Sequence, residues 1–304
     1  MAADGLLLVD KRPGSTSHDA VQQARRILRE RRIGHCGTLD PDATGLLLLP
    51  VGATTRLTRF LIHAPKVYEG VVQLGAATDT YDASGKVVSE APVPESAVER
   101  LTDVLAGFVG TFEQRLPAYS ARKVGGVKLY ELARRGEEVP ESSKEVTVYE
   151  LEATGPLAEG RFPFRLACSS GTYARSIAHD VGQELGCGGH LASLRRTAIG
   201  PFRIEDALPL EAIAERSARG ETLGSAWIPL SRVPLPFSEL VLDATQERRV
   251  EHGQTVLAKG ADGEEGDWVK LVDGRGELVA VASIAERVGE GRLTVLQPRV
   301  VFRS

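Results

Sequence analysis

Apolar residues along this chain fall into short runs that have the length of β-strands. Residues 5–9 are apolar at almost every position, which is typical of a buried strand, and 46–51 form a second run of this kind. Further strand-like runs follow at 67–74, 146–151, 162–167, 269–272, 278–281, 293–296 and 300–302. Glycines break up the last four of these runs, a pattern that predicts a small β-barrel.

Four other segments show the spacing of apolar residues that is typical of helices. The first begins at the start signal Ser15-Thr16-Ser17, runs through Arg32 and ends at Gly34. The other three are predicted around residues 98–105, 173–185 and 209–216. Because strands and helices do not alternate regularly, the pattern predicts an α+β fold and not a doubly wound sheet.

A proline-containing linker at residues 229–236 separates the mixed segment from the glycine-broken strands. We therefore expect two domains, a large one at residues 1–233 and a small barrel at 234–304.

The composition indicates a soluble globular protein, with 42% hydrophobic and 26% charged residues in a chain of 304. No apolar run approaches the roughly 20 residues of a membrane span, and the N-terminus lacks the pattern of a signal peptide. The three cysteines are an odd number without zinc-ligand spacing, which fits a reducing compartment. We therefore expect a cytoplasmic protein that does not bind membranes. Since there is no coiled-coil pattern, we also expect a monomer.

The net charge of −4 excludes a general polycation, so any nucleic-acid binding must depend on local basic clusters. Four clusters are candidates, although each taken alone is more typical of a solvated surface. They lie at residues 25–32, 122–128, 134–135 and 195–196.

The strongest candidate for chemistry is the loop at residues 37–45, in which glycine, proline and threonine surround Asp40 and Asp42. A carboxylate on such a tight loop is exposed to a ligand and fixed in direction, as a nucleophile or general base must be. A plain turn is the simpler interpretation, because Asp-Pro followed by glycine is common turn chemistry.

A third interpretation is the aspartyl nucleophile of a magnesium-dependent phosphatase of the haloacid dehalogenase type, which Asp40-x-Asp42-x-Thr44 matches. That motif requires a hydrophobic strand directly before the first aspartate. Here residues 35–38 precede Asp40 and the apolar run follows the loop, which disfavours the phosphatase.

Seven short motifs decide between these interpretations. In chain order they are GLLLVDKRPG (5–14), GHCGTLDPDATG (34–45), KVY (66–68), TDTYD (78–82), PAYSARK (117–123), CSSGTYAR (168–175) and HLASLRR (190–196). Each is weak alone, but together and in this order they resemble the TruB family, the tRNA pseudouridine-55 synthases, over nearly the whole chain. Cys36 and Val67 depart from the family's pattern without affecting a position to which the family assigns catalysis.

This resemblance implies a largely antiparallel central sheet flanked by helices, followed by a C-terminal PUA-like domain. It also implies that the substrate is the T-arm stem-loop of tRNA, in which one uridine of the loop is isomerised to pseudouridine. The glycosidic bond breaks, the uracil turns, and C5 bonds to C1′. The resemblance implies no metal and no cofactor.

The resemblance further assigns roles to individual residues. Asp40 matches the essential aspartate, Arg175 the arginine that pairs with it, and Tyr68 the tyrosine that stacks on the extruded base. The substrate-binding positions are matched by His35, Asp82, Lys123, Tyr173 and Leu194. Two mechanisms stay open, nucleophilic attack by Asp40 on C1′ and glycal formation with loss of the C2′ proton. A tRNA-binding or folding protein with dispensable catalysis is the non-enzymatic alternative.

Overall fold

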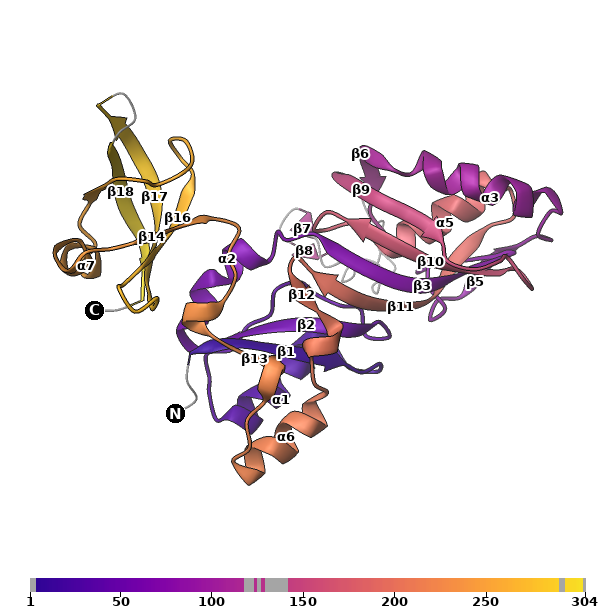
Figure 1. The fold of residues 1–304 in the computed structure, drawn as a ribbon. Helices are drawn as coiled ribbons and strands as arrows, with labels where there is room; N and C mark the ends of the chain where they lie inside the picture. The colour runs from indigo at the N-terminus through magenta and orange to yellow at the C-terminus, as the bar shows by residue number, and fades with distance from the viewer. Residues whose placement is uncertain (1–3, 118–122, 125–126, 129–141, 290–292, 303–304) are drawn as a thin grey trace.

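The protein has an α+β fold built on one large and one small sheet, as the sequence predicts (Figure 1). The computed structural model describes residues 4–117, 123–124, 127–128, 142–289 and 293–302. In the large sheet every pairing is antiparallel except the one between β2 and β11. Its strands in spatial order are β13 (Trp227–Pro229), β1 (Gly5–Lys11), β2 (Thr44–Val51), β11 (Gly189–Ile199), β3 (Lys66–Leu74), β10 (Arg161–Cys168), β9 (Ser143–Ala153) and β6 (Gly110–Arg115), with β12 (Phe202–Arg203) paired to β11.

Strands β1 and β2 are buried on both faces, which explains why their sequences are apolar without alternation. On one face Leu7 and Leu47 pack in a cluster with residues of α1 (Ser17–Leu28) and α6 (Leu210–Arg219). On the other face Leu6 and Leu46 belong to a cluster that includes residues of α2 (Thr58–Leu61) and of the small sheet. The 37–45 loop thus leads directly into a strand that is held from both sides.

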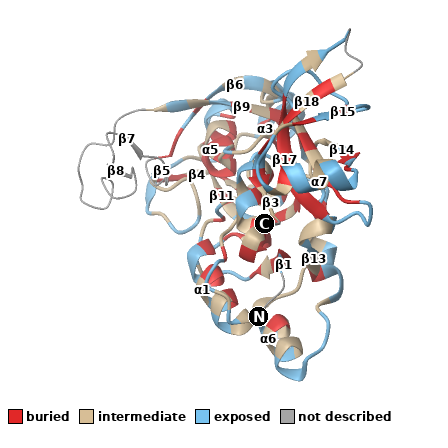
Figure 2. Ribbon diagram, turned by 90° about the vertical axis from the view of Figure 1, so that its left-hand side faces the viewer, coloured by how far each residue is buried: buried red, intermediate tan, exposed pale blue. Residues whose placement is uncertain are grey.

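The other half of the large sheet is covered on one face by α3 (Ser96–Gly107) and α5 (Ala174–Glu184). Leu101 of α3 and Ile177 of α5 pack in one core with Phe162 of β10 and Val72 of β3. The helices predicted around 98–105, 173–185 and 209–216 are therefore confirmed. Figure 2 shows that α1 and α6 combine buried and exposed residues, as expected of helices that cover a sheet.

The small sheet curls into a half-barrel at the C-terminal end of the chain, drawn in yellow in Figure 1. Phe60 of α2 contacts Trp268 of this sheet edge to face, with ring centroids 4.9 Å apart, so the two sheets share a core. The predicted boundary between residues 233 and 234 falls between β13 of the large sheet and the first strand of the small one, and it stays a prediction. The small sheet contains β14 (Ser238–Val241), β16 (Trp268–Val272), β17 (Leu278–Val288), β18 (Leu293–Val301) and β15 (Val256–Ala258), accompanied by α7 (Ala244–Glu251).

The prediction that the first helix runs through Arg32 is wrong, because α1 ends at Leu28. Arg29 adopts a left-handed backbone with φ of 52°, and its N–H donates to the carbonyl of Arg25. Ile33 then forms a β-bridge with Val51, which requires an extended chain and removes it from the helix.

Several other elements also differ from the sequence prediction, and two of them show why. The runs at 293–296 and 300–302 are joined in the single strand β18, which ends at Val301, because a shift in register against β17 accommodates Pro298. Strand β11, which begins at Gly189 and contains His190, was not predicted. The sequence does not show the alternation of a strand here, because Arg195 and Arg196 are adjacent charged residues. Arg196 is nevertheless buried in spite of its charge.

Candidate active site

The loop that carries Asp40 is fixed by buried side chains from neighbouring elements. Lys11, at the end of β1, is only 1% exposed. Its ammonium donates to the carbonyls of Pro41 at 2.9 Å, Ser15 at 2.7 Å and Arg12 at 3.0 Å. Ser17, at the start of α1, accepts a hydrogen bond from the N–H of Leu39 at 2.8 Å. The backbone on both sides of Asp40 is therefore held in place before any ligand binds.

Arg196 holds the same loop from β11 and is fully buried. Its guanidinium donates to the carbonyls of Leu46 at 2.8 Å, Gly37 at 3.2 Å and Thr38 at 3.4 Å. The prediction that residues 195–196 form a basic surface cluster is wrong for Arg196. A buried charged group must be hydrogen-bonded, and the carbonyls of the loop satisfy that requirement.

Gly45 marks the end of the loop, where the chain passes against β11. Its φ is +100°, and a Cβ atom there would lie 2.3 Å from the carbonyl oxygen of Arg196. We expect Gly45→Ala to lower the free energy of unfolding by about 2–4 kcal/mol, because backbone cannot move aside as a side chain can. Gly14→Ala is the matched control, since Gly14 also has a positive φ, +80°, but no atom within 4 Å of the added Cβ. Equal losses in urea unfolding of the two variants would contradict the close approach.

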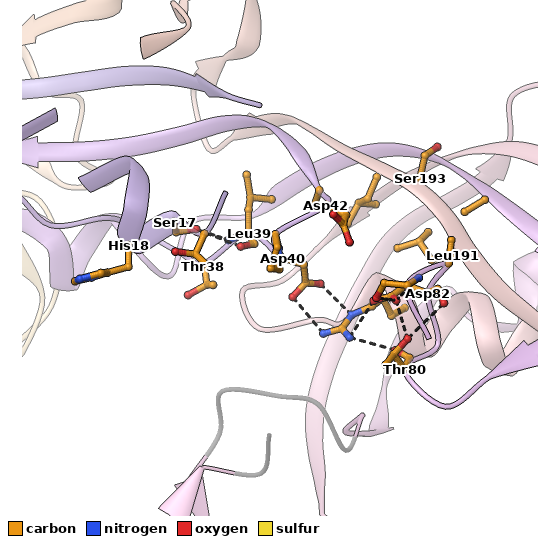
Figure 3. Close-up of a pocket in the computed structure, with 18 of the residues that line it drawn as sticks. Ser17, His18, Thr38, Leu39, Asp40, Asp42, Thr80, Asp82, Leu191 and Ser193 are labelled. Atoms are coloured by element: carbon orange, nitrogen blue, oxygen red, sulfur yellow. Dashed lines mark hydrogen bonds and ion pairs between the residues drawn. The ribbon is translucent and has the colours of Figure 1, made fainter. Parts of the chain in front are cut away.

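Asp40 forms a two-point ion pair with Arg175, which lies in the first turn of α5. Nε of Arg175 is 2.9 Å from one carboxylate oxygen of Asp40, and Nη2 donates to the other at 3.2 Å. The remaining Nη1 donates to Oδ2 of Asp82 and to the carbonyl of Thr80, both at 3.2 Å. Figure 3 shows Asp40, Thr80 and Asp82 converging on these interactions. Arg175 thus fixes the orientation of Asp40.

Asp82 is itself oriented by its own loop. Its Oδ1 accepts from the hydroxyl of Thr80 at 2.7 Å and from the hydroxyl and N–H of Ser84 at 2.6 and 3.1 Å. The carboxylate that faces Arg175 therefore cannot rotate without breaking several hydrogen bonds.

A cavity of about 880 Å³ opens beside this network. It lies within the size range of sites that bind small molecules or single residues of a polymer. Of the residues predicted from the sequence, Asp40, Arg175, His35, Asp82 and Leu194 line it. The segments that meet here come from five parts of the chain: the start of α1, the 37–45 loop with His35 before it, the loop around Thr80, α5 and β11.

The carboxylate of Asp40 faces the cavity, so 41% of its side chain reaches solvent although protein surrounds its other sides. Burial raises the pKa of Asp40, the Arg175 guanidinium lowers it, and the Asp82 carboxylate raises it again. Burial is the largest of these effects and leaves the pKa above the ordinary value of 3.8. A carboxylate with a raised pKa is a better proton acceptor than an ordinary aspartate.

This shift predicts how activity depends on pH. If catalysis requires ionised Asp40, kcat falls as the pH decreases through the raised pKa of Asp40, and does so above the range of an ordinary aspartate. Acid unfolding caused by Asp40 does not explain such a loss. Because folding raises the pKa of Asp40, the ionised carboxylate destabilises the folded protein at high pH, and this destabilisation disappears as the pH falls. Single-turnover rates measured against pH, with circular dichroism at each pH, check the prediction. A rate that stays constant down to pH 4 would contradict it.

Two predicted site residues, Tyr68 and Tyr173, are not among the residues that line the cavity, and the side chain of a third is not described. Tyr68 lies in β3, is 8% exposed and packs in the core with Leu39. Burial raises the pKa of Tyr68, which keeps the phenol neutral. Tyr173 precedes α5, and its backbone N–H and C=O are both hydrogen-bonded to the side chain of Gln114. Lys123 lies in β7 (Lys123–Val124), and its side chain is outside the described residues.

His35 lines the cavity and is half-buried. Burial lowers the pKa of His35, and the nearby Arg196 and His18 lower it further. The imidazole is therefore neutral at physiological pH, which suits filling of space and hydrogen bonding better than storage of a positive charge.

Sequence reasoning missed several residues that build this site, namely Lys11, Ser17, Thr80, Ser84 and Arg196. Lys11, Thr80 and Arg196 lie inside the seven motifs, so their place in a motif could have indicated that they belong to the site. Ser17 and Ser84 lie outside the motifs. Among the described residues, no group of three or more His, Cys, Asp or Glu side chains could hold a metal ion. Within the same part of the chain, no helix has the length and apolar character needed to cross a membrane.

Comparison with known proteins establishes the relationship that the motifs indicate. The family model described as "TruB family pseudouridylate synthase (N terminal domain)" matches residues 25–174, and the one described as "tRNA pseudouridylate synthase B C-terminal domain" matches 175–241. This chain belongs to the TruB family. It is therefore a pseudouridine synthase, an isomerase.

Relatives in the TruB family cover most or nearly all of the chain. The tRNA pseudouridine synthase B of Opitutus terrae is 50% identical over 210 residues, which are 69% of this chain and 87% of that protein. The one from Streptococcus gordonii is 40% identical over 301 residues, 97% of this chain and 96% of that protein. The second alignment includes the half-barrel, which lies largely beyond the residues that the two family models match.

Solved structures show the same fold. The chain superimposes on a protein in the "Structure of H/ACA RNP bound to a substrate RNA containing 2'-deoxyuridine" with a TM-score of 0.76 at 25% identity, covering 99% of this chain and 85% of that one. It also matches a chain of a "Cbf5-Nop10-Gar1 Complex" with a TM-score of 0.75 at 26% identity, covering 97% and 83%. The pseudouridine synthase fold is thus shared over essentially the whole molecule.

Proposed function

We propose that this enzyme isomerises the uridine at position 55 in the T-loop of tRNA to pseudouridine, with Asp40 as the essential carboxylate. Curated TruB relatives named as tRNA enzymes support the substrate class. The observation that carries the role of Asp40 is its two-point ion pair with Arg175 in the wall of a cavity large enough for a nucleoside.

The reaction exchanges one bond for another without an external reactant. The C1′–N1 bond of the uridine breaks, the uracil turns within the cavity, and C5 bonds to C1′. The proton on C5 is lost as N1 gains one, so that the product has the composition of the substrate. Because the base must be detached and turned, the uridine is first extruded from the folded loop into the cavity.

Asp40 can act in two ways that its geometry supports equally. Its ionised carboxylate attacks C1′ and forms an ester, which is resolved when C5 attacks the same carbon. Alternatively it stabilises cleavage while a base removes the C2′ proton, giving a glycal, and the proton returns to C2′ when C5 bonds to C1′. In both cases Arg175 keeps the carboxylate oxygens directed at the sugar and limits the rise in the pKa of Asp40.

The remaining site residues act on the RNA. Tyr68 is only 8% exposed in the free protein, and it stacks on the extruded uracil once RNA binding exposes its ring. His35 fills the space that the base leaves in the RNA. Leu194 and Tyr173 shape the pocket for the pyrimidine, Asp82 orients Arg175, and Lys123 contacts a phosphate. Base stacking discriminates little, so selection of uracil depends on hydrogen bonds to its edge and on the shape of the pocket.

We further propose that the enzyme works as a cytoplasmic monomer on the T-arm stem-loop. Residues 234–304 would serve as a PUA-like RNA-binding domain beside the catalytic domain at 1–233. Phe60 and Trp268 lie in one hydrophobic core that both sheets share, which supports a fixed arrangement of the two domains. No metal or other cofactor takes part in the proposed reaction.

The test uses a T-arm stem-loop RNA that carries tritium on C5 of uridine 55 only. Formation of pseudouridine releases this tritium to water, and the expected result is complete release by native protein, with or without a chelator. The same RNA labelled at another uridine should release none. Release that a chelator abolishes would favour metal-dependent chemistry, and tight binding without release would favour an RNA-folding protein.

A further inference from the structure

The loop that orients Arg175 is itself held between two elements of the large domain. Tyr81 lies between Thr80, whose carbonyl accepts from Arg175, and Asp82, whose carboxylate does so too. The carbonyl of Tyr81 accepts from the N–H of Leu191 in β11 at 2.9 Å, and the N–H of Ala83 donates back to Leu191 at 3.0 Å. On this side, backbone hydrogen bonds tie the loop to β11.

The backbone of Tyr81 has an unusual conformation for a bulky residue. Its φ is +64°, in the left-handed region that glycine adopts without strain and that other residues rarely adopt. This turn allows the residues before and after Tyr81 to present their oxygen atoms to the same nitrogen of Arg175. Since an aromatic residue occupies a position that favours glycine, its side chain must contribute something that glycine lacks.

The ring of Tyr81 stacks on His179, with centroids 3.9 Å apart and planes inclined by 16°. His179 lies four residues after Arg175 in α5 and therefore on the same face of the helix. Nδ1 of His179 is buried and has no hydrogen-bond partner among the residues described. Burial lowers the pKa of His179 and nearby Arg115 lowers it further, so the ring is neutral. Stacking on Tyr81 is thus the specific contact that the described structure gives this ring.

We propose that Tyr81 and His179 are a positioning pair for the active site. Their stack fixes the loop around Thr80 and Asp82 to the helix that carries Arg175, and so fixes the direction in which Arg175 holds Asp40. The proposal rests on the proposed role of Asp40. Neither residue touches the substrate; both act through Arg175.

The pair can be tested with three variants. Tyr81→Gly removes the ring but tolerates the left-handed backbone, His179→Ala removes the surface on which the ring stacks, and Tyr81→Phe keeps the ring as a matched control. The first readout is kcat and KM for tritium release from the T-arm stem-loop. The second is the pH at which the carboxylate of Asp40 titrates in the free protein, followed by 13C NMR and assigned by its loss in Asp40→Asn.

We expect Tyr81→Gly and His179→Ala each to lower kcat about tenfold with KM changed less than about twofold. In both, the titration of Asp40 should move to higher pH by roughly half a unit or more, because the guanidinium that favours the ionised form is held less firmly. The double variant should lose no more than either single one, and Tyr81→Phe should match the native enzyme.

Three results would overturn the proposal. These are an unchanged kcat and titration in Tyr81→Gly, a loss of thermal stability alone, and a loss in Tyr81→Phe equal to that in Tyr81→Gly. The titration separates this proposal from the proposed function. If the native protein releases no tritium, the function fails, whereas a shift in the titration of Asp40 still reports whether the stack positions Arg175.

Discussion

Replacing Arg196 with methionine is expected to lower the free energy of unfolding by about 3–5 kcal/mol. Methionine fills much of the same volume but donates no hydrogen bond. The carbonyls of Gly37, Thr38 and Leu46 then lose a donor inside the protein, and each buried acceptor left unsatisfied costs about 1–3 kcal/mol. Because these carbonyls belong to the 37–45 loop and the strand that follows it, and Asp40 is proposed to act from that loop, the variant should also lose activity in conditions where it is still folded.

Arg195→Met is the matched control for this change. Arg195 is the neighbouring arginine, is 42% exposed and forms a surface ion pair with Asp10 at 2.9 Å. Exposed pairs contribute up to about 1 kcal/mol. The pair with Asp10 is bidentate and can contribute more, so the control should lose some stability but much less than Arg196→Met. Urea unfolding followed by tryptophan fluorescence measures both, since the chain has two tryptophans, Trp227 and Trp268. Equal stability of the two variants would show that Arg196 does not hold the loop.

Asp40→Asn is expected to lower the single-turnover rate of isomerisation by at least about 10³-fold while leaving the affinity for the T-arm RNA within about threefold. The amide has the shape of the carboxylate and can still accept from Arg175, so the fold and the cavity should persist. It has neither the negative charge nor the nucleophilicity that both proposed mechanisms require. Rates from rapid mixing and affinities from filter binding separate the two effects.

The control for Asp40 is the other aspartate of the same loop. Asp42 is exposed and forms no ion pair among those the structure describes, so Asp42→Asn should keep its rate within about threefold. A phosphatase of the haloacid dehalogenase type would need both aspartates. A large loss in Asp42→Asn, or full activity in Asp40→Asn, would therefore contradict the assignment of Asp40.

The parts of the fold that follow from local patterns were predictable. The apolar runs at 5–9 and 46–51 predicted β1 and β2, because a strand buried on both faces is apolar at nearly every position. Asp40 and Arg175 were found through motifs, and the structure brings them together although 135 residues separate them. The helix predicted through Arg32 failed because a tertiary β-bridge of Ile33 outweighs local helical spacing.

Other features depend on partners that no local pattern reveals. Arg196 resembles a surface residue in the sequence, and only the carbonyls of a segment about 150 residues away make its burial possible. The left-handed backbone of Tyr81 and its stack on His179 likewise exist only once α5 lies against the loop. These are tertiary constraints, in which the environment selects a conformation that the residue type alone disfavours.

The central claim is that Asp40 drives isomerisation of uridine 55. It is tested most directly by mapping pseudouridine at every position of a full-length, unmodified tRNA transcript after incubation with native protein or Asp40→Asn. We predict pseudouridine at position 55 alone with the native protein, and an unchanged transcript with Asp40→Asn. Modification at another uridine, or at position 55 by Asp40→Asn, would contradict the account.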